Sequence, residues 1–386
     1  MHVFIAALHQ PTKPTGVCRH AVNLALCLVN TEVTKISLVI GAWQVDYFKA
    51  AFALESDKIE LVVVNIKNSS LVRNLWFLKG LPKLANQLDA DVVHLSFPFP
   101  FIKSKFKAPV VTTIHDLYPY ECPENFGFPR VLFNQLFLKM AIANSDGLPC
   151  VSRITLDKLK YYFPKLKPQQ KLDVIYNYVD FTGLETSPPQ QLAKDNKFFL
   201  TVAQHRQNKN LDLLIRAYAE LLQSRQIAPD HNLVIVGTTG PETEKIHRLI
   251  AEFELEPNVS LLSALSDSQL GWLYQNCEAF VIASSTEGFC LPLAEALHFS
   301  DRVICSNIPI FREIATEKCT YFSLENDALN NLSQAIVKVI DSSYSNSSAN
   351  IRRFNKSHIA QQYLNLYYQI GYSQETKKLQ LSNSWN

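Results

Sequence analysis

The chain has 386 residues, of which 47% are hydrophobic and only 19% are charged, so it is too apolar for a disordered protein and too long for a single core. A net charge of +2 excludes the strongly basic surface of a nucleic-acid-binding protein, and no nucleic acid is expected as a partner. The composition is that of a globular enzyme with two domains of ordinary size.

The cysteines and the N-terminus indicate a reducing compartment. The eight cysteines include no CxxC pair and no cluster with histidine at zinc spacing, which predicts reduced, buried thiols. The opening segment MHVFIAALHQ has no basic stretch before its short apolar run, so it predicts a first β-strand and not a signal peptide. No apolar run reaches the roughly 18 residues that cross a bilayer. We therefore expect a cytoplasmic protein.

Short apolar segments rich in β-branched residues alternate with longer segments of helical period along the chain. This alternation predicts βαβ units, parallel sheets and an α/β fold. The segments predicted as strands are 2–8, 35–41, 59–64, 91–95, 109–114, 147–152, 172–176, 198–203, 232–237, 259–263, 279–284 and 302–307.

One polar, proline-containing stretch interrupts this alternation at residues 182–196, where we predict a linker between two Rossmann-like domains. The predicted domains are 1–185 and 186–356. A C-terminal helix over 357–373 is expected to cross back to the first domain, and a polar tail follows over 374–386.

Open parallel sheets bind ligands beyond the carboxyl ends of their strands, and this rule selects candidate residues. His9 follows the first strand, His115 and Asp116 follow the strand at 109–114, and Gly237 closes the strand at 232–237. Glu287 follows the strand at 279–284. All of them are predicted to face a ligand.

The segment 284–297, SSTEGFCLPLAEAL, contains the richest motif. A strand ends, a loop with Gly288 turns, and Pro292 falls where a helix begins, which suits its fixed φ and missing N–H. The unpaired amides at such a helix N-terminus favour a diphosphate. Glu287 in the loop and Glu295 in the helix are then placed to contact different parts of one ligand.

The spacing Glu287-x7-Glu295 resembles the signature of the GT4-type retaining glycosyltransferases with the GT-B fold, also called glycosyl transferases group 1. The resemblance extends to VIYNYVD at 174–180, LVIVG at 233–237 and SNIPIFREI at 306–314. It implies two Rossmann-like domains facing each other across a cleft, with 1–185 on the acceptor side and 186–356 binding the donor. It also implies a nucleotide diphosphate sugar as donor substrate, no cofactor and no metal, and a glycan or lipid-linked acceptor.

The resemblance assigns roles to residues of the second domain. Glu295 would hold the ribose hydroxyls, Glu287 the hydroxyls of the donor sugar, and Arg206 and Lys209 the leaving diphosphate. Gln204 stands where many relatives carry arginine, so Arg206 is offset from the usual position. The remaining donor-binding residues of this domain would be Gly237, Gly288, Phe289, Cys290 and Leu291.

In the first domain the resemblance assigns Gly16 to a turn over the donor, in place of the family's usual pair of glycines. His115 corresponds to a histidine near the reacting sugar, with Asp116 beside it. For each of these residues a structural role stays open: a plain loop-to-helix turn for Gly16 and a core position for His115.

The sequence Asp89-Ala90-Asp91 spells the DxD motif that binds metal in another glycosyltransferase fold. Here it precedes the strand residues VVHL at 92–95 and lies at the amino end of that strand, so we reject it as a metal site. The Rossmann GxGxxG, P-loop and GxSxG motifs do not occur.

The predicted function is therefore metal-independent hexosyl transfer with retention, in polysaccharide or glycolipid biosynthesis. Two alternatives stay open: a nucleotide-sugar epimerase of the same fold, and a non-catalytic protein that binds nucleotide sugars. Epimerised free sugar formed without acceptor would favour the first, and absence of donor hydrolysis would favour the second.

Residues 67–107 predict a peripheral contact with the inner face of the cytoplasmic membrane. A helix over 69–88 would turn Leu, Trp and Phe toward lipid, and a loop over 97–107 would carry aromatic anchors. The alternative is that these apolar side chains face the core of the domain. The cations are Lys67, Arg73, Lys79, Lys83, Lys103, Lys105 and Lys107, and the aromatic residues are Trp76, Phe77, Phe97, Phe99, Phe101 and Phe106.

Overall fold

The structure is a computed structural model that describes residues 1–10, 16–52, 54–181, 183–192, 197–342 and 352–383, with the backbone only for 352 and 372–383. Contacts divide the chain into two compact units. Unit 1 comprises Met1–Tyr178 and Arg352–Asn386, and unit 2 comprises Val179–Ile351. The division precedes the polar stretch 182–196, of which residues 182 and 193–196 lie outside the described part.

Unit 1 contains a parallel sheet of seven strands in the order β3-β2-β1-β4-β5-β6-β7. The order reverses beside β1, and open sheets of this kind bind ligands at such a switch point. The strands are β1 (His2–Ala6), β2 (Lys35–Gly41), β3 (Ile59–Val64), β4 (Val92–Leu95), β5 (Val110–Thr112), β6 (Gly147–Cys150) and β7 (Lys171–Val174).

Helices cover both faces of this sheet, because its central strands are apolar on both sides. Residues on one face pack against α1, α2 and α14, and those on the other against the segment Trp76–Gly80, α4 and α6. The helices are α1 (Gly16–Val29), α2 (Val45–Ala51), α3 (Ser70–Leu75), α4 (Leu81–Gln87), α5 (Tyr118–Glu121), α6 (Arg130–Asn144), α7 (Arg153–Tyr162) and α14 (Lys356–Asn383).

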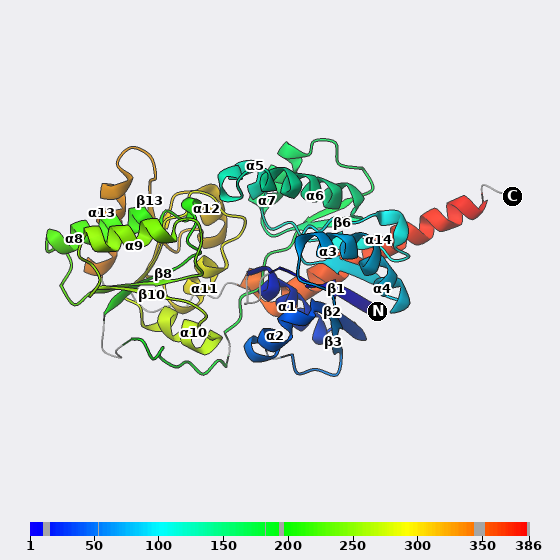
Figure 1. Ribbon diagram of the computed structural model, residues 1–386, viewed down its shortest axis with the longest axis horizontal. Coiled ribbons are helices and arrows are strands. Elements are labelled where there is room, and N and C mark those ends of the chain that lie inside the picture. Colours follow the sequence, from blue (N-terminus) through cyan, green and yellow to red (C-terminus); the bar gives the residue numbers. More distant parts are fainter. Residues whose placement is uncertain (11–15, 53, 182, 193–196, 343–351, 384–386) are drawn as a thin grey trace. The chain divides into compact units, whose positions relative to one another are not determined.

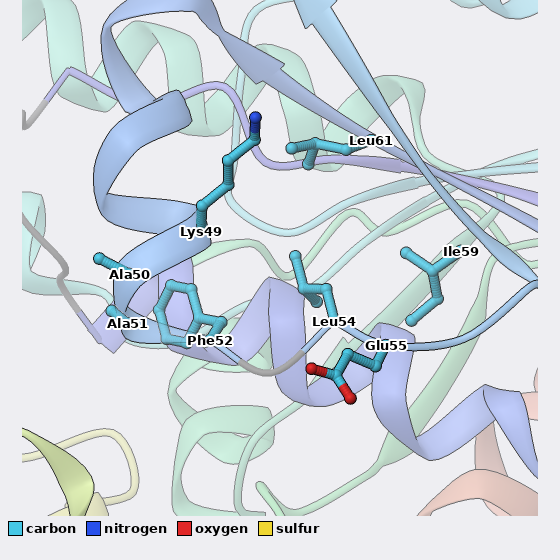
Figure 2. Close-up of a pocket in the computed structure, with 8 residues that line it drawn as sticks. All are labelled: Lys49, Ala50, Ala51, Phe52, Leu54, Glu55, Ile59 and Leu61. Carbon is cyan, nitrogen blue, oxygen red and sulfur yellow. The ribbon is translucent and has the colours of Figure 1, made fainter.

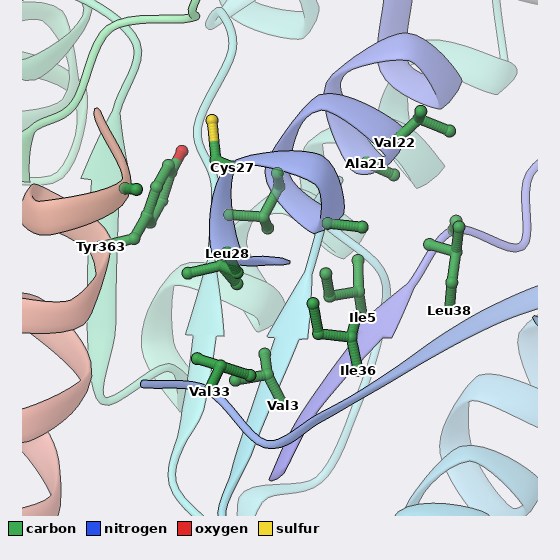
Figure 3. Close-up of a cluster of buried hydrophobic side chains, with 14 of the residues drawn as sticks. Val3, Ile5, Ala21, Val22, Cys27, Leu28, Val33, Ile36, Leu38 and Tyr363 are labelled. Atoms are coloured by element: carbon green, nitrogen blue, oxygen red, sulfur yellow. The ribbon is translucent and has the colours of Figure 1, made fainter. Parts of the chain in front are cut away.

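The C-terminal helix α14 belongs to the core of unit 1. Figure 3 shows Tyr363 of α14 beside Cys27 and Leu28 of α1, above Val3 of β1 and Val33, which precedes β2. All five side chains are buried. The helix therefore completes the first unit although the second unit precedes it in the chain.

Helix α14 is longer than the sequence predicted, since it continues to Asn383 where a polar tail was expected from 374. No proline interrupts this segment, and its Glu, Lys, Gln and Leu residues have high helix propensity.

Unit 2 contains a parallel sheet of six strands in the order β10-β9-β8-β11-β12-β13. The strands are β8 (Phe198–Val202), β9 (Asn232–Val236), β10 (Val259–Leu262), β11 (Ala279–Ile282), β12 (Val303–Ser306) and β13 (Thr320–Phe322). Each of the twelve segments predicted as strands contains one, but the edge strand β13 was missed because its three residues form no apolar run.

The helices of unit 2 also lie on both faces of its sheet. In Figure 1, α8, α9 and α13 lie together on one side, where they bury alternate strand residues, and α10 lies on the other side. The helices are α8 (Leu211–Gln223), α9 (Thr243–Glu252), α10 (Asp267–Asn276), α11 (Leu291–Phe299), α12 (Pro309–Ala315) and α13 (Ala328–Asp341). A capping box between Ser266 and Gln269 begins α10.

The helix predicted over 69–88 is present as α3, a π-helical segment (Trp76–Gly80) and α4. Its aromatic side does not face outward, because Phe77 is buried in the core of unit 1. Leu71 and Leu75 are exposed, at 71% and 47%. An interfacial helix with its Trp and Phe in lipid is therefore excluded, and only two leucines of this segment remain as exposed apolar groups.

The aromatic residues of the loop 97–107 also point inward. Phe99, Phe101 and Phe106 are buried, and Phe99 stacks on Phe77 with ring centroids 4.1 Å apart. The prediction that this loop carries membrane anchors is therefore wrong, because its alternating Phe residues fill the space between the sheet and the helix over 70–87.

Candidate active site

The loop between β11 and α11 in unit 2 contains the motif singled out in the sequence. Strand β11 ends at Ile282, and Cys290 precedes the helix with a left-handed φ of 68°. Helix α11 begins at Leu291 with Pro292 in its first turn. Because Pro292 has no N–H, the remaining amides of this turn are the donors available to an anion.

Glu287 is held by two side chains. Its Oε1 accepts a hydrogen bond from Ser284 Oγ at 2.8 Å and forms an ion pair with Lys209 Nζ at 2.5 Å. The carboxylate is only 6% exposed, so the ion pair with Lys209 offsets the cost of burying its charge. The structure thus brings together two residues that the sequence assigned to one site from segments 78 residues apart.

Glu295 lies on α11 and accepts a hydrogen bond from the hydroxyl of Tyr274 on α10, at 2.8 Å to Oε2. Burial and the Glu295 charge raise the pKa of Tyr274, so the phenol stays protonated and remains a donor. The carboxylate is 7% exposed. Tyr274 therefore fixes the orientation of Glu295, a role that no local motif in the sequence revealed.

Three contacts join the loop after β8 to the loop after β11. Asn208 donates from Nδ2 to the Thr286 carbonyl at 3.2 Å, and its own carbonyl accepts from the Ser285 amide at 2.9 Å. Asn210, in the left-handed region with φ 48°, donates to the Ala283 carbonyl at 2.9 Å. These asparagines flank Lys209 and hold it against the Glu287 loop.

Arg206 precedes this segment and is half-buried. Within the part of the chain that the structure describes, its guanidinium has no ion pair and no side-chain hydrogen bond. It differs in this from Lys209, which Glu287 already neutralises. The two cations predicted for one diphosphate are therefore in different electrostatic states.

Gly237 follows β9 at a close approach between two strand ends. A Cβ there would lie 1.9 Å from the Ala203 carbonyl oxygen, so only glycine fits. Thr243, the first residue of α9, contacts His205, with 3.0 Å between Thr243 Oγ1 and His205 Nδ1. Close packing thus explains why residue 237 is glycine, and the predicted contact of Gly237 with the donor stays a prediction.

The histidine predicted for unit 1, His115, follows β5. Its Nε2 donates to the Ser96 carbonyl at 2.8 Å, which leaves Nδ1 as an acceptor in the neutral ring. Burial lowers the pKa of His115 to about 4, so the ring is neutral at physiological pH. Asp116 Oδ1 accepts from the Tyr118 amide at 3.0 Å in a local turn.

Gly16 begins α1, and nothing lies within 4 Å of the position its Cβ would occupy. The structure therefore gives no steric reason for glycine at this position, and the assignment to a donor-binding turn stays a prediction. The loop 11–15 before it lies outside the described residues.

A buried chain of polar side chains next to His115 was not predicted from the sequence. The His20 ring meets that of His115 edge-on, with centroids 4.6 Å apart, and its Nδ1 lies 2.8 Å from Asn177 Oδ1. Thr113 Oγ1 joins His20 to His94, at 3.2 Å and 2.7 Å from their Nε2 atoms. His94 in turn contacts Tyr367 of α14. No spacing rule connects residues from five distant segments.

Asp89 and Asp91 lie before β4, at the amino end of the strand. Asp91 Oδ2 accepts a hydrogen bond from the His2 amide at 2.6 Å, which gives it a structural role. Among the residues described, no group of three or more His, Cys, Asp or Glu side chains is arranged to hold a metal ion.

No helix in the described part is both long and apolar enough to traverse a membrane.

Unit 1 also has a surface pocket that is not lined by the predicted site residues (Figure 2). It is formed by the end of α2 and the first residues of β3, the amino end of that strand, and contains none of the predicted site residues. Its lining includes Lys49, Phe52, Leu54, Glu55, Ile59 and Leu61.

Two family models match the chain. The model described as "Glycosyltransferase Family 4" matches residues 14–182, and the model described as "Glycosyl transferases group 1" matches residues 185–358. Together they cover nearly all of the chain, including every candidate site residue apart from His9.

Relatives are found among bacterial O-antigen enzymes. The chain is 25% identical over 323 residues to the O-antigen chain mannosyltransferase RfbU of Salmonella typhimurium, which covers 81% of this chain and 84% of that protein. It is 29% identical over 234 residues to the serotype-specific mannosyltransferase WbdA of Escherichia coli, covering 55% of this chain but only 28% of WbdA. The chain thus corresponds to a part of WbdA.

Solved structures share the fold. Anabaena HepE in complex with UDP-glucose matches with a TM-score of 0.66 at 17% identity, covering 97% of this chain and 100% of that chain. WaaG, a glycosyltransferase involved in lipopolysaccharide biosynthesis, matches with a TM-score of 0.65 at 16% identity, covering 97% and 98%. These likenesses and the two parallel sheets confirm the GT-B fold predicted from the sequence.

Proposed function

The chain belongs to the glycosyltransferases of the group 1 and Family 4 type, and from that premise we propose that it transfers a hexose from a nucleotide diphosphate sugar to a hydroxyl group with retention of configuration. The observation that carries this proposal is the pair of buried, oriented carboxylates, Glu287 and Glu295, on either side of the α11 N-terminus. The names of its relatives support polysaccharide synthesis of the O-antigen kind as the pathway.

The donor is assigned to unit 2. Glu295, oriented by Tyr274, would accept hydrogen bonds from the two ribose hydroxyls, and the turn at Leu291 would present amides to the diphosphate. Glu287 would accept hydrogen bonds from the hydroxyls of the sugar. Gly288, Phe289 and Cys290 line this loop and are buried, so they would shield the reacting centre from water.

Charge develops on the diphosphate as the sugar departs. The bond between the anomeric carbon and the β-phosphate oxygen breaks, through a state resembling an oxocarbenium ion. The acceptor oxygen bonds to the same face, and its proton passes to the departing phosphate. Arg206 and Lys209 would stabilise the negative charge without a metal ion, Lys209 by exchanging part of its interaction with Glu287 for phosphate oxygens.

His115 is assigned to the reacting sugar. Because the ring is neutral and Nε2 already donates to Ser96, its Nδ1 offers a lone pair to a sugar hydroxyl. A neutral ring also adds no positive charge beside an oxocarbenium-like centre. Asp116, which follows it, is held in the local turn with Tyr118, and Gly16 is assigned to the donor on the family resemblance.

The experiment is a donor screen followed by product analysis. Nucleoside diphosphates and their sugars are screened by thermal shift, since a ligand of the native state raises the midpoint of unfolding. The proton NMR coupling of the anomeric centre then compares donor and product. An inverted product would overturn retention, and activity abolished by EDTA and restored by Mg²⁺ would overturn metal independence.

The same screen separates the two alternatives. Epimerised sugar released without acceptor would identify a nucleotide-sugar epimerase. Donor binding with neither hydrolysis nor transfer would identify a non-catalytic binding protein. Transfer that Glu287→Gln lowers and Glu220→Gln, an exposed control on α8, leaves unchanged supports the transferase.

For the membrane contact we propose a surface other than residues 67–107. Four large apolar side chains are exposed on α6 and two residues before it, and no acidic residue occurs between Glu124 and Asp146. Cations at Arg130 and Lys139 border them, which suits an anionic leaflet. The side chains and their exposed fractions are Phe128 (83%), Leu132 (52%), Phe133 (56%) and Leu136 (50%).

A further inference from the structure

Arg73 on α3 is a buried cation without an acidic partner. Its side chain is 8% exposed, and among the described residues it forms no ion pair. The guanidinium donates from Nη1 to Asn68 Oδ1, a neutral acceptor. A buried charge that no carboxylate neutralises destabilises the fold unless a ligand compensates for it.

His9, three residues after the end of β1, carries the second polar group that has no partner of its own. Its Nδ1 is buried and has no hydrogen-bond partner among the residues described. The positive charge of Arg73 lies close enough to help burial lower the pKa of His9 to about 4. The ring is therefore neutral and can carry a proton on Nδ1 to donate to an anion. It also contacts Phe97 edge-on, with centroids 5.5 Å apart.

The backbone around His9 is held in place. The His9 amide donates to Gln44 Oε1 at 3.1 Å, and its carbonyl accepts from Trp43 Nε1 at 2.9 Å. Asn68, the partner of Arg73, donates from Nδ2 to the Gln10 carbonyl at 3.0 Å. Asn68 thus ties Arg73 to the segment that carries His9, and the two groups are arranged before any ligand binds.

The position in the sheet agrees with a ligand site. His9 follows β1, Phe97 follows β4 and His115 follows β5, so these residues gather at the carboxyl ends of neighbouring strands. Open parallel sheets bind their ligands at this edge, beside the switch point next to β1. The site belongs to unit 1 and is distinct from the donor residues of unit 2.

We propose that Arg73 and His9 bind an oxyanion, a phosphoryl or carboxylate group, that is part of the acceptor. The inference rests on the proposed function, in which unit 2 already holds the diphosphate of the donor. A guanidinium presents its N–H donors in a planar fork that fits the oxygens of either group, and one nitrogen here is engaged by a neutral amide only. The chain thus selects acceptors that carry negative charge near the hydroxyl that reacts.

Binding of pyrophosphate, measured by calorimetry with the donor site saturated by a nucleoside diphosphate, tests the proposal. Arg73→Gln should weaken pyrophosphate by about 10- to 100-fold, the cost of losing a charge-assisted hydrogen bond. Lys79→Gln removes an exposed cation from the same helical stretch and should leave binding unchanged. Equal affinity in the wild type and in Arg73→Gln would overturn the proposal.

Nucleotide binding keeps this test separate from the proposed function. If Arg73→Gln still binds the nucleoside diphosphate with wild-type affinity, the variant is folded, and loss of pyrophosphate binding reports on the anion site. Wild-type protein that binds no nucleotide would overturn the proposed function instead. Farnesyl diphosphate and glucuronate, used as competitors, distinguish a lipid-linked phosphoryl group from the carboxylate of an acidic sugar.

Discussion

The two units of this chain use similar sheets but differ in what they present to solvent. Every large apolar side chain that is exposed in the described part belongs to unit 1, and none belongs to unit 2. These residues are Val63, Leu71, Leu75, Ile102, Phe128, Leu132, Phe133, Leu136, Tyr161 and Tyr368. Unit 2 instead concentrates its buried charge in one place, where Lys209 and Glu287 pair beside Glu295.

This difference follows from what each unit is proposed to bind. A nucleotide diphosphate sugar has the same ribose and diphosphate in every donor, so a fixed set of polar groups recognises it. An acceptor varies in charge and in attachment to lipid, and a surface that meets it needs apolar area and adaptable cations. Variants of each unit test whether donor binding by the polar groups of unit 2 can be changed without changing the surface contacts of unit 1, and the reverse.

The largest effect is expected at Lys209. Lys209→Met should lower kcat by about 100- to 1,000-fold, because one preorganised group that stabilises the leaving diphosphate is lost. The same change leaves Glu287 buried without its ion pair, so stability falls as well. Initial rates and urea unfolding are measured on the same preparations.

The double variant Lys209→Met/Glu287→Gln separates the two consequences. It removes both charges, so much of the lost stability should return while activity stays low. Lys197→Met, an exposed lysine beside β8, is the control. Recovery of activity in the double variant would show that the ion pair serves folding alone.

A smaller effect on the same unit is expected from Tyr274→Phe. Removing the hydroxyl frees one oxygen of Glu295 from its fixed position, so the KM for the donor should rise about 3- to 10-fold with little change in kcat. Tyr218→Phe is a matched control, since its hydroxyl is also buried and bonds the His231 carbonyl at 2.6 Å. Equal KM changes in both variants would contradict a role for Tyr274 in holding the donor.

The sequence predicted twelve of the thirteen strands in the described part and the turn from strand to helix over 284–297, because these depend on local patterns. Apolar runs marked the strands, and the Glu287 loop sits directly after one of them. It did not predict Tyr274 as the partner of Glu295, or the contact of His94 with Tyr367, because such pairs are set by tertiary packing. The thirteenth strand, β13, was missed since three residues give no period.

The error in residues 67–107 has a similar origin. Interleaved aromatic and basic residues are compatible with a membrane anchor and with a loop whose Phe side chains fill a core, and composition does not distinguish them. The structure decides by placing Phe99 against Phe77 inside unit 1. On α6 no such signal is present, since the apolar residues of 130–144 do not gather on one side of the helix, and only the structure shows which of them are covered.

The exposed face of α6 gives the next prediction. Wild-type protein should co-sediment with vesicles containing phosphatidylglycerol at low salt, and less so at high salt. Replacing Phe128 and Phe133 by Ser should lower the partition coefficient about 10-fold or more, because each aromatic ring loses apolar area that would be buried. The control replaces Leu71 and Leu75 by Ser. A larger decrease of the partition coefficient in the control would indicate that residues 67–107 make the membrane contact instead.

The last effect concerns acid, and it should again distinguish the two units. The pKa of His9 and of His115 is lowered to about 4, and that of His94 to about 3, in each case mainly by burial. Since the ordinary value is 6.5, the unfolded chain binds protons first as the pH falls. The stability these neutral rings contribute is therefore complete above pH about 6.5 and is lost as the pH drops toward 4.

Each such histidine contributes a slope of about 1.4 kcal/mol per pH unit to the free energy of unfolding within that window. Unit 2 has His205 and His298 with smaller decreases in pKa, so its dependence should be shallower. Hydrogen exchange of β4 and β5 is compared with that of β8 and β9 at pH 7 and pH 5. Unit 1 should lose protection first, and His94→Gln should flatten its slope. Equal loss of protection in both units at pH 5 would mean that the buried histidines do not make unit 1 more sensitive to acid than unit 2. The units would then differ only in their surfaces and in the donor site.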